Sequence, residues 1–243
     1  MRALIQNEIS GFFSTLTGYI VIIVFLLLNG LFIWVFPGEN NILETGYASL
    51  NSLFTLAPWI FLFLVPAVTM RSFAEERKTG TLELLLTRPL SDLQIILAKY
   101  LAGVLLVVFA LLPTLIYLLS IYFLGSPKGN FDTGGTWGSY LGLFFLATIY
   151  VSIGIFSSSL TENQIIAFIV AVLICFMVYI GFDFIGSMNI FQAINDIILD
   201  LGIEEHYRSI SRGVVDSRDI VYFLGVNGVF ITLTWLKLNS RKR

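Results

Sequence analysis

The sequence predicts an all-α polytopic membrane protein with six transmembrane helices. Hydrophobic residues make up 57% of the 243-residue chain and charged residues only 12%, about half the charged share of a typical soluble domain. The mean hydropathy is +0.87. Six apolar runs approach the roughly 20 residues that an α-helix needs to cross a bilayer. Such a chain cannot hide its apolar surface in one soluble core, so we expect the lipid bilayer to surround it.

The apolar runs follow one another with short connections, which favours a single membrane domain over 1–243. Pro58 and Pro66 fall in the second run, where neighbouring helices can satisfy the freed carbonyls. Pro113 is expected to bend the third. The spans are predicted at residues 16–36, 53–70, 95–124, 137–158, 164–185 and 219–237.

Positive charges predict the orientation of these spans. Ten Lys and Arg residues fall in the N-terminal segment, the 71–99 loop and the C-terminal segment, against four in the loops on the other side. An excess of Lys and Arg in short loops marks the cytoplasmic side of a membrane. We therefore expect both termini and the 71–99 loop to be cytoplasmic.

The 71–92 loop is the best candidate for contact with a soluble partner. Between residues 71 and 99 the chain gathers nine of its 30 charged residues. Gly80 breaks the charged run, and Thr81 is placed to cap a new turn that carries apolar side chains. A loop that merely holds positive charge inside does not require a capped apolar turn. The predicted partner contact comprises Glu76, Lys78, Thr79, Gly80, Thr81, Leu82, Glu83, Leu84 and Leu85.

The third span is predicted to begin at a capping motif. Pro89 stops the preceding turn because its ring cannot continue a helix. Ser91, followed three residues later by Gln94, has the spacing of a capping box, in which each side chain bonds the other residue's backbone N–H.

Two amphipathic segments are predicted beside the spans. Residues 1–13 gather apolar side chains on one face, which suits a helix lying in the cytoplasmic interface. Residues 188–201 would reach about 21 Å as a helix, short of the roughly 30 Å hydrocarbon core. We expect 187–215 to form an outer re-entrant segment that gates the subunit interface, with Gly202 ending its first helix. The predicted gate residues are Asp183, Gly186, Phe191, Ile194, Ile198 and Gly202.

No pattern in the sequence indicates catalysis. The phosphate-binding motif G-x-x-x-x-G-K-[ST] is missing. His206, the single histidine, is expected to be a solvated surface residue because a metal site needs several converging donors. Ser157, Ser158 and Ser159 have no base near them in sequence, and we interpret them as the end of the fourth span. We therefore predict no catalytic residue, metal ligand or nucleic-acid site in this chain.

Three segments are similar to a known family. They are RSFAEERKTGTLELLLTRPLS at 71–91, HYRSISRGVVDSRDIVYFL at 206–224 and NEISGFFSTLTGYIV at 7–21. The chain resembles, over essentially its whole length, permease subunits of ABC-2 type ABC transporters. Within that family it resembles the gliding-motility-associated permeases of Bacteroidetes, although copper- and nitrous-oxide-related permeases share these motifs. The resemblance implies an interfacial N-terminal helix, a cytoplasmic coupling helix over 76–85 and re-entrant helices over 188–212.

The resemblance also implies a function and a set of partners. The chain would be a permease subunit in a bacterial inner membrane, without its own ATPase and without a cofactor. A separate ATPase subunit would bind ATP and Mg, and a second permease-like subunit would complete a heteromer or a homodimer. Two functions remain open at this point: coupled transport, or a non-transporting anchor that uses the same ATPase to act on gliding or envelope machinery.

Overall fold

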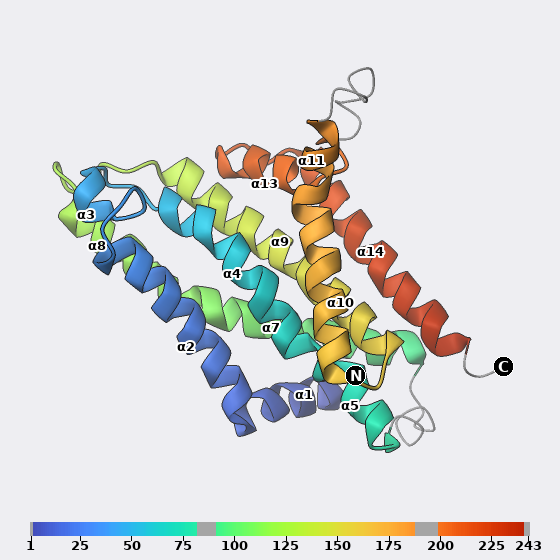
Figure 1. Ribbon diagram of the computed structural model, residues 1–243. Coiled ribbons are helices and arrows are strands. Elements are labelled where there is room, and N and C mark those ends of the chain that lie inside the picture. The colour runs from blue at the N-terminus through green and yellow to red at the C-terminus, as the bar shows by residue number, and fades with distance from the viewer. Residues whose placement is uncertain (1, 82–90, 188–198, 241–243) are drawn as a thin grey trace.

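The computed structural model describes residues 2–81, 91–187 and 199–240, and this part of the chain is helical (Figure 1). Six of its helical stretches are long and apolar enough to cross a membrane. The predicted all-α polytopic fold is therefore confirmed. No strand occurs within the described ranges.

The six candidate spans lie within a few residues of the predicted ones, apart from the second. That span continues to residue 78, because a short helix follows directly on the predicted segment 53–70. The spans comprise α2 (Leu16–Gly30) with the π-helical η1 (Leu31–Val35); α4 (Asn51–Thr69) with α5 (Arg71–Lys78); α7 (Asp92–Leu111), η2 (Leu112–Thr114) and α8 (Leu115–Leu124); α9 (Thr133–Leu160); α10 (Gln164–Phe176), the π-helical η3 (Met177–Gly181) and α11 (Phe182–Gly186); and α14 (Ser217–Asn239).

Helix α9 lies at the centre of the bundle and packs against α4, α5, α7, α10, α13 and α14. Small residues allow this close approach, as is usual where helices pack in a membrane. A Cβ atom on Gly154 would lie 1.9 Å from Thr69 Oγ1, and one on Gly103 would lie 2.8 Å from the Val151 side chain. Any larger residue at Gly154 would therefore force α4 away from α9.

The helix ends form two groups (Figure 1). Helix α1 (Arg2–Ser14), α5 and the end of α14 lie at the lower end of the bundle in this view, whereas α3 (Ile42–Thr45), α11 and α13 (Ile203–Ser211) lie at the upper end. We call these the junction end and the far end. An even number of crossings places both ends of the described chain at the junction end.

The short segments differ from the prediction in one respect. A helix, α1, occupies nearly all of the predicted amphipathic segment 1–13 and packs on α7. Residues 188–198 lie outside the described part, so a helix there stays a prediction. Gly202 has φ −81° and directly precedes α13, so it begins a helix rather than ending one in the left-handed conformation expected of a C-terminal glycine.

Candidate functional site

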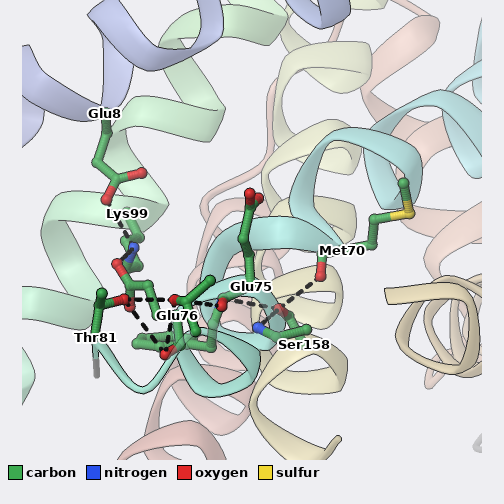
Figure 2. A network of polar contacts seen from close by, with 10 residues as sticks. Glu8, Met70, Glu75, Glu76, Thr81, Lys99 and Ser158 are labelled. Atoms are coloured by element: carbon green, nitrogen blue, oxygen red, sulfur yellow. Dashed lines mark hydrogen bonds and ion pairs between the residues drawn. The ribbon is translucent and has the colours of Figure 1, made fainter. Parts of the chain in front are cut away.

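The candidate site is centred on the connection between α4 and α5. The predicted partner contact begins in α5 and continues beyond it. The Ser158 hydroxyl of α9 accepts hydrogen bonds from the N–H groups of Phe73 and Ala74, at 2.9 and 3.0 Å (Figure 2). It donates one to the Met70 carbonyl at 2.9 Å. The hydroxyl thus links Met70 and Ala74, the pair that an ordinary α-helical bond would join. A side chain inserted in this way is a known cause of helix bending, and the α-helix is interrupted at Met70.

Arg77 makes a second connection between α5 and α9. Its Nη1 donates a hydrogen bond to the Ser159 carbonyl at 2.5 Å. The last carbonyls of a helix lack intrahelical partners and carry the negative end of its dipole. Arg77 therefore satisfies the end of α9, and together with Ser158 it fixes α5 to the central helix.

Lys99 connects α5 to two further helices. Its Nζ lies 2.7 Å from Glu8 Oε1 of α1 and 2.7 Å from Glu76 Oε1 of α5, as Figure 2 shows. The Lys99 side chain is only 2% exposed, and its ammonium also lies 5.2 Å from the centre of the Phe73 ring. A charge this buried needs partners, and removing one partner of such a pair is strongly destabilising. One ammonium thus holds α1, α5 and the start of α7 together.

The exposed end of α5 carries part of the predicted partner contact. Lys78, Thr79, Gly80 and Thr81 are exposed. The Thr79 hydroxyl donates to the Glu75 carbonyl at 2.9 Å and lies 2.9 Å from the Thr81 hydroxyl. These hydroxyls cap the end of α5. The turn that Thr81 is predicted to cap continues into residues 82–90, which lie outside the described part of the chain. Gly80 has φ +73°, which explains glycine at the break.

The other residues of that contact divide into two groups. Glu76 is half-buried and directed at Lys99, so it connects helices within the chain. Leu82, Glu83, Leu84 and Leu85 lie outside the described residues. The predicted capping box at the start of α7 is confirmed: the Gln94 N–H donates to Ser91 Oγ at 3.3 Å and the Ser91 N–H to Gln94 Oε1 at 3.1 Å.

A cavity of about 310 Å³ lies between α1 and α5, beside the ion pairs of Lys99. Its charged wall consists of Glu8, Arg71, Glu75, Glu76 and Lys99. Within the described ranges, no group of three or more His, Cys, Asp or Glu side chains is placed to hold a metal ion. Polar contacts thus connect α5 to α1, α7 and α9 at this place.

The structure describes three of the six predicted gate residues, and these three lie at the far end. Asp183 lies in α11 and is half-buried, Gly186 is buried at the end of α11, and Gly202 precedes α13. Phe191, Ile194 and Ile198 lie outside the described residues. Helix α13 packs closely on α9: a Cβ atom on Gly138 would lie 2.3 Å from the Ile210 carbonyl oxygen.

His206 is not the solvated residue that we expected. Its side chain is 16% exposed, and Nδ1 lies 2.7 Å from Asp219 Oδ1 of α14. Nε2 lies 2.8 Å from the Asp200 carbonyl oxygen, and the ring stacks on Tyr222 with 3.8 Å between centroids. This network joins α13 to α14. Spacing along the chain did not reveal this network, because Asp219 lies 13 residues from His206, on a different helix.

Sequence reasoning also missed the roles of Ser158 and Lys99. Lys99 was counted only as one positive charge among ten, and Ser158 as the end of a span. The partners of Ser158 lie 84 to 88 residues away along the chain, and Glu8 and Glu76 lie 91 and 23 residues from Lys99. Short-range spacing therefore gave no signal of these contacts. A lysine at the fifth residue of a predicted span is itself unusual and would have justified a search for a buried carboxylate.

Comparison with known families agrees with this architecture. Residues 39–238 match the family described as ABC-2 family transporter protein, which is most of the chain. Comparison with curated proteins gives no match. The matched region includes all but the first of the six candidate spans, and both α5 and α13. The chain is thus a multi-pass membrane protein that belongs to the ABC-2 transporter family, as a non-catalytic permease subunit of the kind that works with an ABC ATPase.

Proposed function

We propose that this permease couples ATP hydrolysis by a separate ATPase subunit to movement of its membrane helices, in the inner membrane of a gliding bacterium. ATP and Mg are held by the ATPase. The subunit is of the gliding-motility-associated, GldF-like type that its sequence resembles. The alternative, a non-transporting anchor for gliding or envelope machinery, would use the same coupling.

One observation carries this proposal. The exposed end of α5, which continues into the predicted coupling segment, belongs to a helix with buried polar contacts to α1, α7 and α9. A push on this end by the ATPase would therefore reach three other helices. ATP can drive such a change only if the ATPase binds the two permease states with different affinities.

The orientation is part of the proposal. The junction end carries the excess of Lys and Arg, so α1, α5 and both termini are cytoplasmic. α2 and α10 each present exposed apolar side chains, among them Ile20, Ile23, Ile169 and Leu173. These surfaces suit lipid and a second permease subunit, either a homologue or a second copy.

Co-purification with the ATPase tests the coupling segment. Leu84→Asp places a charge in the predicted apolar contact, and an unpaired desolvated charge costs several kcal/mol. The matched control is Leu43→Asp in α3, at the far end, where the leucine is 63% exposed. We expect Leu84→Asp to lose the ATPase and Leu43→Asp to retain it. Retention by both variants, each inserted normally in the membrane, would contradict docking at this segment.

ATP hydrolysis by the purified complex separates transport from anchoring. Stimulation by a compound that also accumulates in proteoliposomes would support transport. ATPase activity that depends on the permease but responds to no such compound would favour the anchor.

A further inference from the structure

His206 lies between two groups that accept hydrogen bonds and have none to donate. Its Nδ1 atom lies 2.7 Å from Oδ1 of Asp219, in the first turn of α14. Its Nε2 atom lies 2.8 Å from the backbone carbonyl oxygen of Asp200, which precedes α13. A neutral imidazole has one N–H donor and one bare nitrogen, whereas an imidazolium has two donors. Because each nitrogen has an acceptor beside it, the imidazolium is the form that makes both bonds.

The surroundings of Asp219 favour a carboxylate at this place. Its Oδ2 atom accepts a hydrogen bond from the Ser209 hydroxyl at 2.8 Å, and the helix dipole favours a negative charge in the first turn of α14. The residue is only 5% exposed, and a buried charge needs an opposite charge beside it. Among the described residues, Asp219 forms an ion pair with His206 alone. The carboxylate therefore also requires the ring to be charged.

The other charged groups around the ring have partners of their own or are exposed. Glu204 and Glu205 form ion pairs with arginines of the same segment. Asp200, Asp216 and Arg218 have exposed side chains. The elements α9 and η3, which also pack on α13, carry no charged residue. The carboxylate beside Nδ1 is thus the charge that the ring meets at close range.

The ring connects three segments of the far end. From α13 it bonds the Asp200 carbonyl, and it stacks on Tyr222 of α14 with 3.8 Å between ring centroids. The Tyr222 hydroxyl donates a hydrogen bond to the Leu201 carbonyl at 2.6 Å. Two bonds therefore hold the residues before α13, one from each helix. Without a proton on Nε2, a bare nitrogen would face the Asp200 carbonyl oxygen, and the first of these bonds would be lost.

We propose that His206 is a pH-responsive connection, in which the imidazolium holds residues 199–202 on α13 and loss of the Nε2 proton to solvent weakens this attachment. Histidine ordinarily changes its charge between about pH 5 and pH 8. The neutral ring keeps its proton on Nδ1, where the Asp219 carboxylate accepts it. The stabilising contribution is present while the ring is charged and is lost as the pH rises. In the proposed orientation, the far end would respond to the pH outside the cytoplasm.

Nitrogen NMR measures the protonation directly. His206 is the single histidine of the chain, so ¹⁵N-histidine labelling of the full-length protein, purified without a histidine tag, reports this ring alone. In phosphatidylglycerol bilayers we expect N–H signals from both ring nitrogens at low pH. Between about pH 5 and pH 9, the Nε2–H signal should disappear while Nδ1–H remains. In Asp219→Asn the ratio of charged to neutral ring at one pH should fall about tenfold or more, because a charged partner is lost.

A spin label measures the release of the segment. In a Cys175→Ser background, a label at Leu201→Cys should gain mobility as the pH rises, and a label at Val214→Cys, after α13, should not. Both side chains are exposed. Tyr222→Phe keeps the stacked ring but removes the second bond, so it should enlarge the gain at residue 201. His206→Gln cannot titrate in this range and should abolish the pH dependence.

The parent protein alone can overturn the proposal, so the test does not depend on the folding of a variant. A ring that stays neutral or stays charged across the whole titration would overturn it, as would a neutral ring protonated on Nε2. Unchanged mobility at residue 201 while the ring titrates would overturn the release. This inference goes beyond the proposed ATPase coupling, and none of these readouts involves the ATPase, so either proposal can fail without the other.

Discussion

The Ser158 hydroxyl of α9 lies between Met70 and Ala74. It accepts a hydrogen bond from the Ala74 N–H at 3.0 Å and donates one to the Met70 carbonyl at 2.9 Å. It joins the central helix to the helix that carries the predicted coupling segment. The removal of this oxygen should therefore affect both stability and coupling.

We predict that Ser158→Ala lowers the free energy of unfolding by about 1–3 kcal/mol, because buried backbone groups lose their partner. ATPase binding should persist, while ATP-driven activity falls as α5 loses its connection to α9. Ser157→Ala is the matched control: Ser157 is also fully buried, but its hydroxyl has no partner among the described residues. Thermal unfolding and ATPase assays of both variants check this. Equal effects of the two substitutions would refute the role of Ser158.

Lys99→Met should be the most damaging single change at the junction. It leaves the carboxylates of Glu8 and Glu76 without their shared cation, and breaking a buried pair in this way costs about 3–5 kcal/mol. Lys78→Met, at an exposed lysine, is the control and should be close to neutral.

A rescue variant separates charge from packing at Lys99. The triple variant Glu8→Gln, Glu76→Gln, Lys99→Met has no charge to leave unpaired, so its melting temperature should recover most of the loss. If the triple variant melts as low as Lys99→Met, then the lysine stabilises by packing, and the ion pairs are not its main contribution.

Local chemistry made much of the fold predictable. The six spans could be predicted because each is a continuous run of apolar residues. The Ser91–Gln94 capping box could be predicted because it involves only groups three residues apart. Asn227 of α14 donates a hydrogen bond from its amide to Thr148 Oγ1 of α9, at 3.0 Å. By contrast, Asn29 bonds the Phe25 carbonyl of its own helix at 2.8 Å. Whether a polar residue bonds a neighbouring helix or its own backbone depends on which helix packs beside it. The pattern of apolar spans does not identify that neighbour.

The candidate site was less predictable because its contacts join distant segments. Glu8 and Lys99 are 91 residues apart, and Arg77 and Ser159 are 82 apart. Each looks ordinary alone: a lysine in a positive loop, or a serine at the end of a span. Only the packing of α1 against α7, and of α5 against α9, gives them their partners.

Asp219→Asn should loosen α13 from α14. Asp219 accepts from the Ser209 hydroxyl at 2.8 Å and lies 2.7 Å from His206 Nδ1, and bonds to a charged group contribute about 1.5–3 kcal/mol each. Faster limited proteolysis between 199 and 216 is expected. Asp200→Asn is the matched control, since His206 contacts only the backbone carbonyl there. Equal cleavage of the two variants would count against a stabilising role for the Asp219 carboxylate.

Glu204 gives a pH dependence whose sign follows from burial. Burial raises the pKa of its carboxyl above the usual 4.5, so the folded protein favours the protonated form. That contribution to stability is complete below pH 4.5 and is lost as the pH rises through the folded-state pKa. Glu204→Gln, which stays neutral, should therefore melt higher than the parent at pH 7, with the difference shrinking toward pH 4.

Melting curves of both proteins across this range, with Glu205→Gln as matched control, measure the effect. The burial argument would be contradicted if the melting temperature of Glu204→Gln, minus that of the parent, were lower at pH 7 than at pH 4.

Cysteine labelling tests the orientation on which the coupling proposal depends. Lys78 is exposed at the junction end, and Lys128 is exposed at the far end. Lys128 is a better site than its neighbour Gly129, which has φ +79° and whose Cβ would lie 3.0 Å from the Tyr122 ring. In right-side-out spheroplasts of a Cys175→Ser background, a membrane-impermeant maleimide should label Lys128→Cys and should label Lys78→Cys only after lysis. The opposite pattern would invert the bundle and place α5 where no cytoplasmic ATPase could reach it.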